Sequence, residues 1–140
     1  MDYPNLISTT IPDKCIDEIN EAIIFINKKL PDLVTLSQEE LTTLPKMGRN
    51  TINFVLENLK EAESYPEIVP KNVDIDEIRK DVELIKAIFK ILKPLKKLEK
   101  RLEDCALLAG SEAYLPSIAI YNAIKADAIR RKYKRDKVNA

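Results

Sequence analysis

The sequence predicts an all-α protein, an antiparallel up-and-down bundle of about four helices. Only 2 of its 140 residues are glycine and 8 are proline, which leaves little material for a strand-rich, turn-rich fold. Apolar residues recur at steps of three and four along most of the chain, which is the spacing of one helix face. One domain is therefore expected over residues 1–140, with an N-terminal arm (1–12) and a basic tail (133–140) that fray into solvent.

The first helix is expected to begin near Asp13, a good N-cap residue, and to end at Pro31. Acidic residues lie in its early turns and two lysines in its last turn, which suits the helix dipole. Its apolar positions form a heptad seam: Ile16, Ile19, Ile23, Ile26 and Leu30.

A second helix start is indicated by Ser37 and Glu40, which have the spacing of a capping box. Pro45 removes one helical hydrogen bond, so a kink or a short break is expected there. The main helix that follows is expected to end near Tyr65 and Pro66. Its seam consists of Ile52, Val55, Leu59 and Ala62.

The longest helical pattern is expected to start at Asp74, which has capping spacing to Glu77. Its periodicity changes near Pro94, so a kink is expected at that residue. The seam before the proline consists of Ile78, Val82, Ile85, Phe89 and Leu92.

Gly110 and Ser111 are interpreted as a helix end followed by a fresh start, which gives a last, alanine-rich helix. Pro116 is expected to bend or delay its first turn. The apolar face of this helix is wide, and a central place in the bundle is predicted for it.

Two motifs, LPKMGRNT at residues 44–51 and LAGSEAY at residues 108–114, resemble those of a family of small, uncharacterised bacterial helical proteins. The resemblance extends from about residue 37 to residue 125. It implies a four-helix-bundle-like fold and a bacterial cytoplasmic origin, and it carries no activity to transfer. The chain departs from the family pattern at Pro116 and in its basic ending.

The chain contains no histidine, which excludes Ser-His-Asp and Cys-His catalysis and the Glu-x-x-His pairs of di-metal bundles. Two cysteines cannot supply a zinc site, and no phosphate-binding glycine motif occurs. We therefore expect no catalytic residue, no metal and no cofactor, and a protein that is not an enzyme. Cys15 and Cys105 are interpreted as small core hydrophobes in a reducing compartment. The chain shows neither a signal peptide pattern nor an apolar stretch of about 18 residues, so a cytoplasmic location without membrane insertion is expected.

Charge is divided along the chain. Residues 1–70 hold 6 basic and 12 acidic residues, a net of −6, and residues 71–140 hold 17 and 11, a net of +6. Five lysines at helical spacing form a basic stripe that could follow a nucleic-acid backbone or bind an acidic partner: Lys86, Lys90, Lys93, Lys97 and Lys100. A solvated face that keeps the bundle soluble is the alternative, and it is favoured because the stripe holds no arginine and few aromatics.

A polar pocket is the other candidate site, at the helix junction that contains Glu112. Tyr114, Tyr121 and Asn122 follow within about three turns and could line it together with Glu112. The alternative is that Ser111 and Glu112 cap a helix while the tyrosines bury their rings and leave their hydroxyls in water.

The leading functional prediction is an interaction or structural module that self-associates or binds a protein partner through a helical surface. Nucleic-acid or polyanion binding through the lysine stripe is the first alternative and is not favoured. Small-molecule binding near Glu112 is the second.

Overall fold

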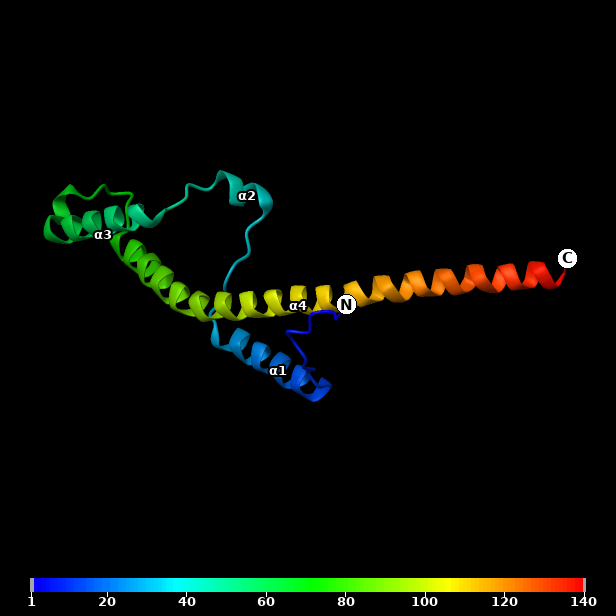
Figure 1. The fold of residues 1–140 in the computed structure, drawn as a ribbon. Helices are drawn as coiled ribbons and strands as arrows, with labels where there is room; N and C mark the ends of the chain where they lie inside the picture. Colours follow the sequence, from blue (N-terminus) through cyan, green and yellow to red (C-terminus); the bar gives the residue numbers. More distant parts are fainter. Residues whose placement is uncertain (1, 140) are drawn as a thin grey trace. The chain divides into compact units, whose positions relative to one another are not determined.

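The computed structural model describes residues 2–139, apart from the side chains of residues 49 and 50. Helices are the only regular secondary structure in the described part of the chain, which contains no strand, and this confirms the all-α class (Figure 1). Its elements are α1 (Asp13–Lys29), α2 (Gln38–Thr43), α3 (Arg49–Ser64), the 3-10 helix η1 (Pro66–Ile68) and α4 (Ile75–Val138). Internal contacts divide the chain into two units. We call Pro12–Leu92 the hairpin unit, and Met1–Ile11 with Lys93–Ala140 the arm unit.

Two of the predicted helix starts are confirmed by their caps. The Ser37 hydroxyl accepts a hydrogen bond from the backbone N–H of Glu40 at 3.2 Å, and it donates to the Glu40 carboxylate. One carboxylate oxygen of Asp74 accepts from the backbone N–H groups of Asp76 and Glu77, at 3.0 and 3.3 Å. These bonds satisfy amide groups that have no partner inside a first helical turn.

Helix α1 begins differently from the prediction, because Pro12 occupies the N-cap and Asp13 is the first helical residue. The φ of Pro12 is −61°, the value to which its ring restricts the backbone. Asp13 therefore acts as an acidic residue in the first turn, where it suits the helix dipole.

Prolines have different effects in the two parts of the chain. Pro45 lies between α2 and α3, so the predicted break is confirmed. Pro94 and Pro116 lie inside α4, which continues through both of them. The predicted helix end at Gly110 is wrong, because α4 also continues through that residue, without a positive φ. Good helix formers on both sides outweigh one glycine, which costs a helix only about 1 kcal/mol relative to alanine.

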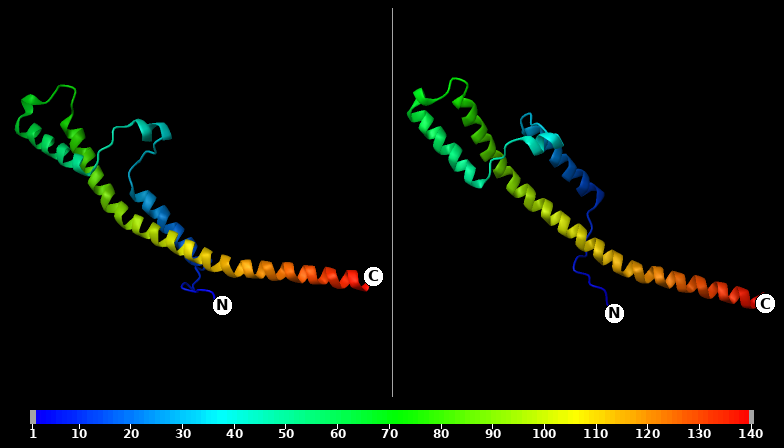
Figure 2. Two further views of the ribbon diagram at one scale, coloured as in Figure 1. Left: turned by 45° about the horizontal axis from the view of Figure 1, so that its top comes forward. Right: turned by 90° about the horizontal axis from the view of Figure 1, so that it is seen from above.

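Most of the half-buried apolar residues of the hairpin unit lie on α3 and on the beginning of α4, the two helices of the hairpin drawn in green (Figures 1 and 2). Val82 is 4% exposed, and the predicted α3 seam is half-buried throughout. On α4, Ile85 and Leu92 are half-buried, but Phe89 is 59% exposed and Ile88 is half-buried in its place. The buried stripe therefore continues from Ile85 by a step of three, to Ile88, and not by the predicted step of four, to Phe89.

A packed four-helix bundle is not evident in the described residues, because few contacts join parts of the chain that are distant in sequence. Val82 is the only buried residue in the described part of the chain. The α1 seam is largely exposed, and Ile19 and Ile23 are 52% and 50% exposed. Cys15 and Cys105 are exposed as well, so their interpretation as core residues was wrong. Both lie on helix faces that no other element covers.

Replacing Gly110 with alanine tests the continuity of α4. A Cβ atom at this position would meet no other atom within 4 Å, and the backbone is already helical. The substitution is expected to raise the free energy of unfolding by about 0.5–1 kcal/mol, since glycine loses more conformational entropy in a helix. Urea unfolding followed by circular dichroism measures the change.

Ala106→Gly, at another exposed position of α4, is the matched control and is expected to lower the free energy of unfolding by a similar amount. A loss of stability in Gly110→Ala would show that the helix does not continue through this residue.

Candidate functional site

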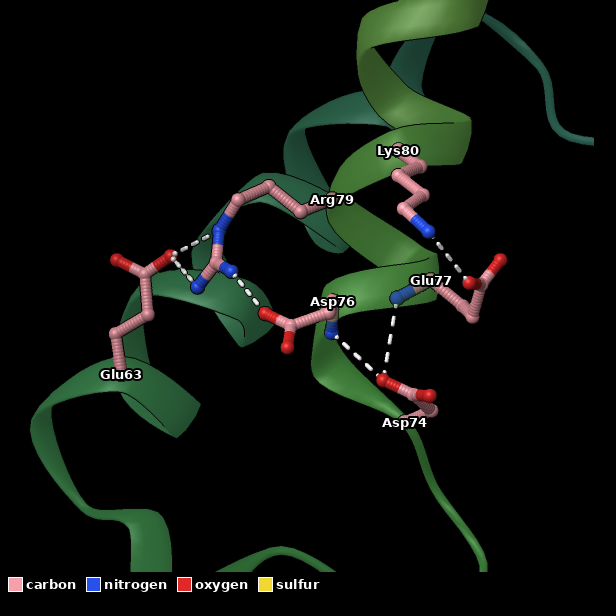
Figure 3. Close-up of polar contacts among 6 residues, drawn as sticks. All are labelled: Glu63, Asp74, Asp76, Glu77, Arg79 and Lys80. Carbon is pink, nitrogen blue, oxygen red and sulfur yellow. Dashed lines mark hydrogen bonds and ion pairs between the residues drawn. The ribbon is translucent and has the colours of Figure 1, made fainter.

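Arg79 links the two helices of the hairpin that is formed by α3, η1 and the first turns of α4. Its guanidinium donates to the Glu63 carboxylate on α3 at 2.8 and 3.2 Å, and to Asp76 on α4 at 2.6 Å (Figure 3). The hydrogen bond to Glu63 is the largest cause of the raised pKa of Arg79. The first turns of α4 are therefore connected to α3 through a single side chain.

An ion pair next to this contact remains within α4. The Lys80 ammonium donates to Glu77 at 3.0 Å, and this hydrogen bond raises the pKa of Lys80 (Figure 3). Both groups are largely exposed, so the pair is screened by salt and stabilises the first turns of the helix only modestly.

An apolar groove lies between the arms of the hairpin. It has a volume of about 450 Å³, and all but two of its lining residues are apolar. The main walls are formed by Phe54, Val55, Leu59, Ile68, Val73 and Ile78. Phe54 and Ile68 are 64% and 62% exposed, so apolar side chains are presented to solvent at this groove. This size and composition are those of a surface that binds an apolar group.

The sequence pattern did not reveal this groove, since it predicted only that one helix ends near Pro66 and that the next begins at Asp74. The 3-10 helix η1 forms between these two points, with hydrogen bonds from Ile68 to Tyr65 and from Val69 to Pro66. The available signal was the apolar residues Ile68, Val69 and Val73, in a connection where polar residues are usual.

The predicted lysine stripe is partly neutralised within α4. In the hairpin unit, the Lys86 ammonium lies 3.5 Å from the Glu83 carboxylate. In the arm unit, Lys100 donates to Asp104 at 2.7 Å. Lys90, Lys93 and Lys97 form no ion pair among the described residues.

Glu112 binds the N-terminal arm within the arm unit. Its carboxylate accepts hydrogen bonds from the backbone N–H of Leu6 and, at 3.4 Å, from that of Ile7. A cavity of about 530 Å³ lies beside this contact, lined by residues 5 and 7–10 of the arm and by Ala109, Glu112 and Ala113 of α4. The arm segment that was expected to fray therefore has a defined contact.

A cavity does lie at Glu112, but the structure does not bring the other three candidate residues to it. Tyr114, Tyr121 and Asn122 are exposed and do not line the cavity. Tyr121 instead has the Lys125 ammonium 5.0 Å from its ring centroid. Sequence reasoning predicted the arm but missed its contact with Glu112, because an extended segment carries no periodic signal.

Truncation of Glu112 tests its contact with the arm. Glu112→Ala removes the acceptor for the amides of Leu6 and Ile7, so hydrogen exchange of these two amides is expected to accelerate by about tenfold, the scale of one hydrogen bond to a charged group. Amide exchange measured by NMR gives the change directly. Glu103→Ala, at another acidic position of α4, is the control and should leave both rates unchanged.

Among the described residues, no group of three or more cysteine or acidic side chains could hold a metal ion. None of the helices in this part of the chain is both long and apolar enough to cross a membrane.

Comparison with known proteins yields no match to a family model, to a curated protein or to a solved structure. The all-helical class implied by the resemblance is confirmed by the structure, although residues 44–48 of the first motif lie outside any helix, and no family is identified.

Proposed function

We propose that this chain is a non-enzymatic helical interaction module that completes its hydrophobic core against another polypeptide. One observation carries the proposal: Val82 is the only buried residue of the described chain, although helix faces rich in isoleucine and leucine run along α1, α3 and α4. Large exposed apolar surfaces on a folded chain are typical of sites that bind other proteins.

The energetic argument is clearest for α1. Its 17 residues are near the length at which an isolated helix is marginal in water. Ile16, Ile19 and Ile23 are each 43–52% exposed, and complete burial of such a side chain contributes about 1.5–3 kcal/mol. The contribution still available from one seam is thus several kcal/mol, comparable to the net stability of many domains.

The four-helix bundle predicted from the sequence belongs to this proposal as the bound arrangement. In that state the seams of α1 and of the second part of α4 would pack against partner helices in the usual heptad manner. The bacterial cytoplasmic origin implied by the resemblance is part of the same proposal.

The two alternative functions have weaker support. Polyanion binding would rely on Lys90, Lys93 and Lys97, since Lys86 and Lys100 already contact carboxylates. Small-molecule binding at Glu112 would compete with the amides of the N-terminal arm, which already occupy that carboxylate.

Dilution of the isolated chain tests the proposed function. At concentrations below the dissociation constant of its complexes, the chain is expected to unfold in a broad, weakly cooperative transition, because the helices lack a shared core. Association with a polypeptide should sharpen the transition and slow amide exchange along the α1 seam. Circular dichroism melts measure the width of the transition, and hydrogen exchange measures the protection of the α1 seam. Both are recorded at several concentrations, and sedimentation velocity gives the state of association at each of them. A strict monomer with cooperative unfolding and slow exchange at the lowest concentration would contradict the proposal.

A further inference from the structure

We infer that the apolar groove of the hairpin unit binds the basic end of α4, residues 125–138, from a second copy of this chain. The inference rests on the proposed function and adds the identity of the partner. We call residues 125–138 the basic segment.

Charge complementarity is the first argument. The residues from Phe54 to Ile78, which span the groove walls, include seven acidic and two basic side chains, a net of −5. The basic segment has seven basic and two acidic side chains, a net of +5. Opposite charges of this size steer association and select the partner.

These charges are largely available for a partner. Glu57, Glu61 and Glu67 form no ion pair among the described residues, and Glu61 lines the groove itself. In the described part of the basic segment, Asp127 pairs with Arg130 and Arg131, at 3.1 and 2.9 Å. Lysines 132, 134 and 137 form no ion pair there. Most of the charge on each side is therefore not compensated within its own chain.

Apolar spacing is the second argument. Along the basic segment, Ala126, Ile129 and Tyr133 share one helix face, at steps of three and four. Ile129 is 71% exposed and Tyr133 is 64% exposed, so this face is uncovered.

The groove offers a matching row on α3. Val55, Leu59 and Ala62 line it at steps of four and three. This row rises by seven residues, or about 10 Å of helix, as the row on the basic segment does. The two rows coincide step for step when the helices are antiparallel. An amphipathic helix in a hydrophobic groove is a common mode of recognition.

Each copy has one groove and one basic segment, so a two-fold arrangement satisfies both contacts at once. Such an interface uses the same surface of both chains and closes at two copies. A dimer is therefore the expected species.

Charge exchange tests the pairing. Lys132→Glu/Lys137→Glu reverses charges beside the apolar face of the basic segment, and Glu57→Lys/Glu61→Lys reverses charges at the groove. Each variant alone is expected to weaken the dimer by about tenfold or more, because attraction becomes repulsion. An equimolar mixture of the two variants should form a heterodimer within about threefold of the wild-type strength. Sedimentation equilibrium measures all three constants on the full chain.

Lys93→Glu/Lys97→Glu is the matched control, since it changes the net charge equally outside the basic segment. Its dimer should stay within about threefold of the wild type, as expected for charges away from the interface. A wild-type chain that is monomeric at every concentration overturns the inference, as do reversal variants that dimerise like the wild type or a mixture that stays monomeric. The inference is also overturned if the Lys132→Glu/Lys137→Glu variant loses binding to DNA while its dimer is unchanged. The basic segment would then bind a polyanion and not the groove.

Failure of this inference is distinguishable from failure of the proposed function. A monomer that unfolds cooperatively contradicts both. A monomer with weakly cooperative unfolding, or a self-associating chain insensitive to these variants, contradicts only the pairing of groove and basic segment.

Discussion

Burial of apolar helix faces is the constraint on which the rest of this structure depends. The helices present apolar seams at heptad spacing, but among the described residues the hairpin unit buries only Val82 and the arm unit buries none. Local signals suffice to start and stop α2 and α4, through the caps at Ser37 and Asp74. They do not supply the burial that makes helices stable in water. This deficit is the reason for the proposal that a second polypeptide completes the core.

The hairpin unit shows how a few interactions organise the part that is packed. Arg79 connects α4 to α3 through Glu63, and Val82 lies one turn further along α4. An exposed ion pair stabilises a fold only weakly, so Arg79 acts mainly by fixing the register of the two helices. With η1 on one side, this register leaves the apolar groove between the arms. Function is proposed at that groove because it is where the packing of the hairpin is incomplete.

Candidate sites were recovered unevenly from the sequence. The lysines were recognised because helical spacing defines a face whatever the tertiary contacts are. Glu112 was also singled out, but its contacts come from Leu6 and Ile7, more than 100 residues earlier, and not from the expected neighbours. The groove was missed entirely. It depends on how residues 66–78 return toward α3, and that path is not encoded in the periodicity of either helix.

By itself, the sequence determined the all-α class, the bounds of α1, α2 and α3 to within a few residues, and the break at Pro45. Each depends on local chemistry: apolar periodicity, capping side chains and the missing N–H of proline. Only the tertiary structure decided that α4 continues through Gly110 and Pro116, and that Cys15 and Cys105 are exposed. A single proline or glycine costs a helix only a few kcal/mol, which good helix formers in the neighbouring turns can offset, so neither residue by itself fixes where a helix ends. Burial likewise depends on which faces meet, and α1 meets no other helix closely within the described residues.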